Sequence, residues 1–171
     1  MKIEIVNDST LQPLEEALLP TPLGTAQILG TTEGVTEIKI IDRNSTHYKT
    51  STAGPVQTCS KELSAYFKGE LQKFSFPLTP RGTDFQKRVW QILQEIPYGE
   101  TITYLEQARR LGNVKAIRAV ASANGRNPLW VVVPCHRVIG SDGSLTGYAG
   151  GLWRKKWLLE HEGARSQLSL F

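Results

Sequence analysis

Cysteine and histidine are scarce in this chain, which has only two cysteines and three histidines among 171 residues. Two cysteines, Cys59 and Cys135, cannot build a disulfide framework. Neither belongs to a C-x-x-C pair and the histidines are scattered, so no ligand set for zinc is evident. We therefore expect no metal, no cofactor and two free thiols, as in a reducing compartment.

Long apolar runs are also missing. No stretch approaches the ~20 apolar residues that a membrane-spanning helix needs, and Met1 is not followed by a signal-peptide pattern. Apolar residues make up 40% of the chain, which is enough to bury a core in one domain or two small ones. We expect a soluble, cytoplasmic and monomeric protein.

Acidic residues are few in the second half of the chain. Residues 1–80 hold 7 basic and 9 acidic side chains, and residues 81–171 hold 13 basic and 7 acidic ones. The net charge is therefore −2 in the first half and +6 in the second. Such asymmetry favours a polyanionic partner for the second half, although solvated lysines and arginines would give the same count.

Residues 1–80 have the pattern of a small α+β domain followed by a linker. Thr25–Gly30 and Val35–Asp42 are strand-like and are separated by a turn-prone stretch. A helix is expected over Cys59–Lys68, ended by Gly69. Leu71–Gly82 has two prolines and little periodicity, and we interpret it as the linker.

Residues 81–163 are expected to form a second, mostly helical domain. Thr83 and Gln86 have capping-box spacing, and apolar residues then recur on one helical face until Pro97 ends the helix. Thr103 and Glu106 form a second capping box, which opens a helix that runs to Leu111.

Gly112-Asn113 breaks that helix, and another is expected over Val114–Ala123. Two short helices around a glycine-containing turn have the outline of a helix-turn-helix, although many such pairs are ordinary packing units. Arg118 is surrounded by small residues, which are Ala116, Ala119, Ala121 and Ala123. These alanines could let the helix approach a sugar-phosphate strand while Arg118 enters a groove, or they could simply pack against the neighbouring helix.

The stretch before Cys135 is apolar and β-branched, and Leu129–Val133 is expected to be a buried strand. Pro134 cannot donate to a sheet ladder, so pairing should stop there. Cys135 would then lie where a rigid strand ends. A glycine-rich loop follows at 147–151, and a last helix is expected over Leu152–Glu162.

The Cys135-His136 pair suggests a nucleophilic cysteine, since a thiol reacts as thiolate and needs a base. Adjacent residues of an extended chain point to opposite sides, so a bridging water or a bend would have to join His136 to the sulfur. The imidazole also needs a group that fixes its tautomer, and Glu162 is our candidate. A purely structural cysteine remains the alternative on these residues alone.

Several ordered blocks resemble the O6-alkylguanine-DNA alkyltransferase family of bacterial type, the methylated-DNA–protein-cysteine methyltransferases. They are PCHRVIG at 134–140, GYAGG at 147–151 and K-x-WLL-x-HEG at 155–163. Further matches are TPLG at 21–24, FQ-x-x-VW at 85–90, IPYGE-x-x-x-Y at 96–104, RAV at 118–120 and NP at 127–128. The resemblance covers nearly the whole chain.

This resemblance implies an α+β protein with a small N-terminal RNase H-like domain and a mostly helical C-terminal domain that carries a helix-turn-helix. It implies direct repair of duplex DNA without a cofactor. The alkyl group of O6-alkylguanine, and of O4-alkylthymine, would pass once to Cys135 and inactivate the protein. A helix-turn-helix regulator and a non-catalytic lesion binder are the alternatives.

The resemblance also implies roles for individual residues. Cys135 would be the nucleophile, His136 the water-mediated base, Glu162 its orienting group, Asn127 the holder of the active-site turn and Tyr104 a donor to guanine N3. The residues expected to contact DNA are Arg118, Ala116, Ala119, Ala123, Thr103 and Lys115. Those expected to form the base pocket are Val138, Tyr148, Ala149 and Gly150.

The chain ends in QLSLF, from Gln167 to Phe171. This resembles the short peptide by which bacterial polymerases and repair proteins bind the sliding clamp, with Gln167, Leu168, Leu170 and Phe171 entering a groove. Alternatively, these apolar side chains fold back onto the surface of the protein itself.

Overall fold

The computed structural model describes residues 14–41, 51 and 53–164. The chain divides into two compact units, Met1–Arg81 and Gly82–Phe171, and each is described by itself. Within the described ranges, no helix is both long enough and apolar enough to cross a bilayer.

The first unit contains a three-stranded antiparallel sheet with the order β1-β2-β3. The strands are β1 (Glu15–Thr21), β2 (Gly24–Gly30) and β3 (Val35–Ile41). The last two were expected from the sequence and are confirmed, with ends that differ by one residue. β1 was missed, because its sequence EEALLPT shows no alternation and contains Pro20.

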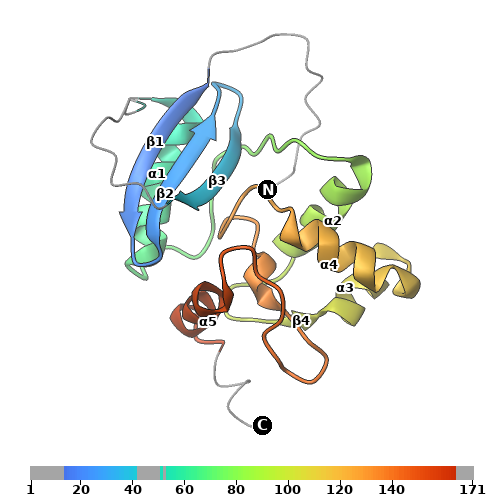
Figure 1. Ribbon diagram of the computed structural model, residues 1–171. Helices are drawn as coiled ribbons and strands as arrows, with labels where there is room; N and C mark the ends of the chain where they lie inside the picture. Colours follow the sequence, from blue (N-terminus) through green and yellow to red (C-terminus); the bar gives the residue numbers. More distant parts are fainter. Residues whose placement is uncertain (1–13, 42–50, 52, 165–171) are drawn as a thin grey trace. The chain divides into compact units, whose positions relative to one another are not determined.

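One helix, α1 (Gly54–Phe67), packs against this sheet, as Figure 1 shows. Its buried residues are Val56, Cys59, Leu63 and Tyr66, which recur at helical spacing. The helix begins five residues before the expected start, where Pro55 occupies its first turn, a position that proline favours. The sheet and helix approach closely at Gly30, where a Cβ would lie 2.8 Å from Cγ2 of Val56.

The segment expected to be a linker is in part bonded to the sheet. Val35 donates its amide to the Pro77 carbonyl and accepts from the amide of Thr79, both at 2.9 Å. Phe76 and Leu78 are buried. The linker interpretation is therefore wrong for this part of Leu71–Gly82, because the backbone pairs with the edge of β3 in a way that apolar periodicity does not reveal.

The second unit is mostly helical. Its elements are α2 (Asp84–Gln94), β4 (Ile102–Thr103), α3 (Tyr104–Leu111), η1 (Val114–Ala116), α4 (Ile117–Gly125), η2 (Cys135–Arg137), β5 (Val138–Ile139) and α5 (Leu152–His161). The two short strands pair in parallel, with Ile102 opposite Val138. This pairing ties the start of α3 to the residues that follow η2.

The two expected helix starts are confirmed. Thr83 and Gln86 exchange both capping-box hydrogen bonds. At the second start, Thr103 accepts from the amide of Glu106 at 3.1 Å. The Glu106 carboxylate pairs with Arg109 and Arg110.

Helices α2, α3 and α4 pack together and are linked by buried polar bonds. Trp90 of α2 donates its indole N–H to the carbonyl of Ala123 in α4, at 2.9 Å. Gln107 of α3 and Asn124 of α4 exchange two amide hydrogen bonds, at 2.9 and 2.7 Å. Both amides are buried, so each is satisfied only while the two helices keep this register.

The expected strand over Leu129–Val133 is wrong. Residues 130–132 form turns and Val133 lies in a bend, with Val132 donating to Trp130 and Val133 donating to Leu129. Val131 lies in the left-handed region with a φ of 71°, which is unusual for a β-branched residue. The residues are buried as expected, but Cys135 opens the 3₁₀ helix η2 instead of ending a strand.

Candidate active site

Cys135 is almost buried, with 8% of its surface exposed. The side chain of Asn127 holds the chain around it. Its amide nitrogen lies 3.4 Å from the Cys135 Sγ and 2.7 Å from the carbonyl of Val133, and its oxygen accepts from the amide of Leu129 at 2.9 Å. One buried side chain therefore shapes the turns before Cys135 and contacts the sulfur.

His136 is fully buried and its Nε2 lies 2.8 Å from Oε1 of Glu162. Its other ring nitrogen, Nδ1, is buried and has no hydrogen-bond partner among the described residues. If Nε2 carries the proton that it shares with Glu162, then Nδ1 is a free acceptor. This is the tautomer that a general base requires.

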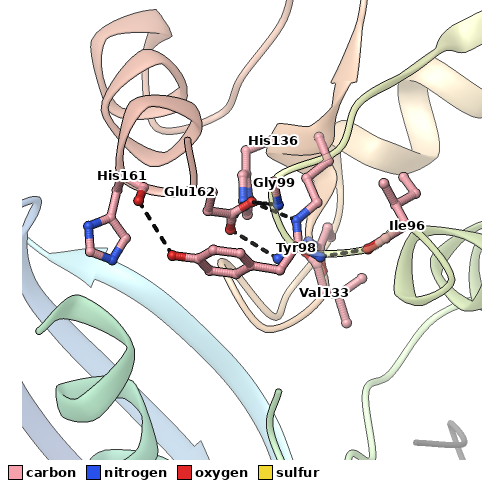
Figure 2. A network of polar contacts seen from close by, with 9 residues as sticks. Ile96, Tyr98, Gly99, Val133, His136, His161 and Glu162 are labelled. Carbon is pink, nitrogen blue, oxygen red and sulfur yellow. Dashed lines mark hydrogen bonds and ion pairs between the residues drawn. The ribbon is translucent and has the colours of Figure 1, made fainter. Parts of the chain in front are cut away.

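Arg137 binds the same carboxylate at two points, with Nε and an Nη at 2.8 and 3.0 Å from Glu162. Its other Nη donates to the carbonyl of Ile96 at 2.6 Å. The amide of Gly99 also donates to Glu162, as Figure 2 shows. Glu162 thus anchors His136 on one side and a buried guanidinium on the other.

The burial of these groups sets their pKa values. Burial lowers the pKa of His136, although Glu162 opposes the shift, so the imidazole is neutral near pH 7. Burial alone would raise the pKa of Glu162, but His136 and Arg137 outweigh it and hold that pKa well below its usual range. Burial also raises the pKa of the Cys135 thiol, while Asn127 and the charge of Lys155 act to lower it.

Lys155 of α5 is fully buried. Its ammonium donates to the carbonyl of Thr146 at 3.0 Å and lies 5.7 Å from the centre of the Tyr104 ring. Burial lowers its pKa to about 8, against the attraction of the Cys135 thiolate. The lysine is therefore mainly charged at neutral pH and is one of the groups whose charge acts on the sulfur.

A cavity of about 550 Å³ is lined by Tyr104 and Thr146, the two neighbours of Lys155, whereas Cys135 and His136 are not among the residues of its wall. Its volume is within the size range of ligand sites. Its walls come from α3, α4 and the loop before α5, and include Tyr104, Ile117, Arg118, Thr146, Tyr148 and Ala149. Burial raises the pKa of the Tyr148 hydroxyl, and the Cys135 thiolate adds to that shift. Both Tyr148 and Tyr104 are thus electrostatically coupled to the sulfur.

The residues expected to contact DNA are divided between surface and core. Lys115, Arg118 and Ala119 are exposed, and Ala116 is half-buried. Thr103 is half-buried and its hydroxyl caps α3. Ala123 is buried with 3% exposed, and its carbonyl accepts from the indole of Trp90 in α2. The expectation that the side chain of Ala123 contacts DNA is therefore wrong.

The residues expected to form the base pocket are also divided. Tyr148 and Ala149 line the cavity. Val138 is fully buried in β5, opposite Ile102, and is not among the residues of the cavity wall. Gly150 is buried, and a Cβ there would lie 2.6 Å from the ring of Trp130, which packs against Tyr148 at 5.6 Å.

Arg137 and Lys155 are both buried, which was not expected from the sequence. Arg137 could have been suspected because it follows His136 directly in an apolar stretch, where a charge needs a buried partner. Lys155 has no such signal, because helix α5 is rich in charged residues along its length. Among the described residues, no group of three or more His, Cys, Asp or Glu could hold a metal ion.

Two family models together cover almost all of the described chain. Residues 14–80 match "6-O-methylguanine DNA methyltransferase, ribonuclease-like domain", and residues 84–164 match "6-O-methylguanine DNA methyltransferase, DNA binding domain". The first unit is thus the ribonuclease-like part of an α+β protein, and the second is the helical part.

Curated relatives and solved structures agree with these models. A methylated-DNA–protein-cysteine methyltransferase of Mycolicibacterium paratuberculosis is 44% identical over 92% of this chain and 97% of its own length. One of Methanosarcina acetivorans is 60% identical over 61% of this chain and 67% of its own. The crystal structure of Mycobacterium tuberculosis OGT in complex with DNA matches with a TM-score of 0.78 and 45% identity, over 88% of this chain and 94% of that one. This chain belongs to the methylated-DNA–protein-cysteine methyltransferase family.

Proposed function

We propose that this protein repairs O6-alkylguanine in DNA by moving the alkyl group to Cys135. The observation that carries this assignment is the contact chain at the cysteine, where Asn127 donates to Sγ and the neighbouring His136 is fixed by Glu162. Lys155, whose charge acts on the sulfur, contacts Thr146 and Tyr104 in the wall of the cavity of about 550 Å³. Membership of the family supports the reaction class.

The transfer is a single displacement. The Cys135 thiol gives up its proton, through a water, to Nδ1 of His136, which has no other partner among the described residues. The sulfur then forms a bond to the alkyl carbon while the bond from that carbon to O6 breaks. The electron pair of the broken bond stays on the base, which finally takes up one proton. The net products are a thioether on Cys135 and an unmodified guanine.

Tyr104 would stabilise the leaving base. Tyr104 is one of the residues that line the cavity, and we assign its hydroxyl a hydrogen bond to guanine N3, where negative charge develops in the transition state. Tyr148 would form a wall of the pocket, and the amide of Ala149 would read the edge of the base. O4-alkylthymine would present the same kind of reacting carbon to the sulfur.

DNA would be bound by the helix-turn-helix that α3 and α4 form around Gly112. Lys115, Arg118 and Ala119 of this unit are exposed. Arg118 also lines the cavity, which favours a role in filling the gap left when the lesion rotates out of the duplex. That rotation costs a few kcal/mol and is easier for a damaged base.

The thioether gives the sharpest test, because water does not readily cleave such a carbon–sulfur bond. Incubation with excess O6-methylguanine duplex should add one methyl group to each protein molecule, at Cys135, as seen by intact-mass and peptide mass spectrometry. Cys135→Ser should bind the duplex without being modified. The matched control is Cys59→Ala, since Cys59 is also a buried free thiol but lies in the first unit.

The same experiment separates the alternatives. A helix-turn-helix regulator or a lesion binder without chemistry would bind DNA and leave Cys135 unmodified. Repeated turnover of excess substrate would contradict the single-use mechanism. Loss of modification only in Cys135→Ser supports the proposal.

We also propose that the last five residues, Gln167–Phe171, bind the bacterial sliding clamp. These residues lie outside those that the structure describes, and the support is the QLSLF sequence itself. Deleting them should abolish clamp binding in a pull-down with purified clamp, while repair of short oligonucleotides continues unchanged. Equal clamp affinity with and without the five residues would refute this role.

The protein is further proposed to act as a cytoplasmic monomer. Both cysteines are free and buried, which suits a reducing compartment. Light scattering of the purified chain, with and without reductant, should give the mass of a single copy.

A further inference from the structure

The carbonyl of Thr146 is shared by two donors. The Tyr104 hydroxyl lies 2.9 Å from this oxygen, and the Lys155 ammonium lies 3.0 Å from it. Thr146 lines the cavity together with Tyr104. The hydroxyl that we assign to the leaving base therefore donates to the protein in this structure.

A phenol has only one proton to donate. Tyr104 cannot donate to Thr146 and to a base in the cavity at the same moment, so it has to leave the carbonyl when the base enters. Thr146 and its hydrogen bond to Tyr104 are exposed in this structure, and a base that enters the cavity would cover them and exclude water from the carbonyl. The Thr146 oxygen would then lose its tyrosine partner just as water can no longer replace it, and a buried unpaired carbonyl is costly.

Lys155 is placed to prevent this loss. An ammonium group has three protons and accepts none, and Lys155 is fully buried with its ammonium already on Thr146. It also lies 5.7 Å from the centre of the Tyr104 ring, a cation–π distance that restricts where the ring can go. Its pKa of about 8 leaves it mainly charged near neutral pH.

We propose that Lys155 is a positioning residue that keeps the Thr146 carbonyl paired, so that the Tyr104 hydroxyl can turn from this carbonyl to the flipped base. This proposal rests on the function proposed above. It differs from a simple electrostatic role, in which the charge of Lys155 would act only on the Cys135 sulfur.

A double-mutant cycle separates the two roles. The variants are Lys155→Met, Tyr104→Phe and the double variant, and the measurement is the single-turnover rate of methyl transfer at saturating O6-methylguanine duplex. Tyr104→Phe should slow transfer by about 10²-fold, the scale for loss of one transition-state donor. If Lys155 acts through Tyr104, Lys155→Met slows the wild type about tenfold but leaves the Tyr104→Phe variant within about twofold of its own rate.

The proposal would be overturned if the double variant is slowed by the product of the two factors measured in the single variants. Such independence would mean that Lys155 acts on the sulfur and not through Tyr104. A second readout checks this without DNA. The rate at which iodoacetamide alkylates Cys135 does not depend on Tyr104 donation. Lys155→Met should therefore slow methyl transfer by a larger factor than it slows iodoacetamide, and equal factors would contradict the inference.

Lys156→Met is the matched control, since Lys156 is the next residue on α5, is exposed and pairs only loosely with Glu160, at 3.9 Å. Lys156→Met should leave the rates of methyl transfer and of iodoacetamide alkylation unchanged.

Lys155→Arg, which keeps charged donors, should recover part of the methyl-transfer rate that Lys155→Met loses. If Lys155→Met does not fold, Lys155→Gln replaces it in the cycle. If the wild-type protein takes up no methyl group, the proposed function itself is wrong. If the wild type is active but the effects of the two substitutions on the rate are independent, only the role of Lys155 is wrong.

Discussion

Asn127 donates its side-chain amide towards the Sγ of Cys135, with 3.4 Å between the two atoms. The same nitrogen donates to the carbonyl of Val133 at 2.7 Å. Hydrogen bonding of this kind favours the thiolate, whereas the burial of the sulfur opposes it. The reactivity of Cys135 therefore depends on a neighbour that also shapes the backbone.

Replacing Asn127 by aspartate should remove the hydrogen bonds to the Cys135 sulfur and to the Val133 carbonyl without changing the size of the side chain. Asp has the same shape but no donor at this position, and its charge would face the thiolate. We expect Asn127→Asp to raise the pKa of Cys135 and to cost about 1–3 kcal/mol of unfolding free energy for the unpaired Val133 carbonyl. The pH dependence of iodoacetamide alkylation and urea unfolding measure the two changes.

Asn113→Asp is the control for this substitution. Asn113 is exposed and caps η1 with its oxygen, which aspartate also provides. An unchanged pKa of the Cys135 thiol in Asn127→Asp would show that Asn127 does not stabilise the thiolate.

Arg137 should be essential for stability because it compensates the buried charge of Glu162. Both of its bonds to that carboxylate are within hydrogen-bonding distance, at 2.8 and 3.0 Å. Arg137→Met would leave the carboxylate buried without this partner and should cost about 3–5 kcal/mol. Chemical denaturation measures the loss.

Removing the charges of both Arg137 and Glu162 should recover part of the unfolding free energy that Arg137→Met loses. In the double variant Arg137→Met and Glu162→Gln, no unpaired carboxylate remains, so we expect greater stability than in Arg137→Met alone. If the double variant is the less stable one, the ion pair is not the reason for the effect.

Stability should also depend on pH through Glu162. Its pKa is lowered in the folded protein, from an unfolded value of about 4.3. Its contribution is therefore complete above pH ~4.3 and is lost as the pH falls further towards the folded pKa. His136, whose pKa is lowered by burial, acts in the same direction below its unfolded pKa of about 6.5, because the unfolded chain then binds its proton more readily.

Glu162→Gln isolates the carboxylate contribution. The difference in unfolding free energy between the wild type and this variant should be constant at pH 6–7 and should shrink when the pH falls below ~4.3. Guanidinium unfolding at a series of pH values gives this difference. A gap that stays constant down to pH 3 would mean that the carboxylate is not stabilised by folding.

Gly150 should tolerate no larger side chain while Trp130 is present. A Cβ at this position would lie 2.6 Å from the Trp130 ring, closer than carbon atoms can pack. Gly150→Ala should therefore cost about 1–3 kcal/mol through overpacking, and Trp130→Leu in the same chain should relieve much of that cost. Gly125→Ala is the control, since a Cβ there meets nothing within 4 Å. Calorimetry that shows equal losses for both glycines would contradict this packing argument.

Local signals in the sequence predicted some elements well. The capping box at Thr83 and Gln86 is a pattern between neighbouring residues, and the structure contains both of its bonds. The contact between His136 and Glu162 was also anticipated, although 26 residues separate them, because a basic imidazole needs a group that fixes its tautomer and the family resemblance implied that this group is Glu162.

Other features could not be derived because they depend on distant parts of the chain. The apolar stretch Leu129–Val133 has the composition of a strand, but the side chain of Asn127 bonds its backbone into turns. Ala123 looks like its neighbours on α4, yet it is buried and its carbonyl bonds to Trp90 of α2. A local pattern does not show which partner will reach a residue from another element.

The paired amides of Gln107 and Asn124 have a mechanical consequence. They lock α3 to α4, and these helices carry Tyr104 and Arg118 respectively. The backbone that carries these two side chains therefore moves as one unit. If Arg118 enters the duplex as proposed, Tyr104 would be carried towards the rotated nucleotide by the same displacement, so the depth of insertion and the position of the phenol would be set together.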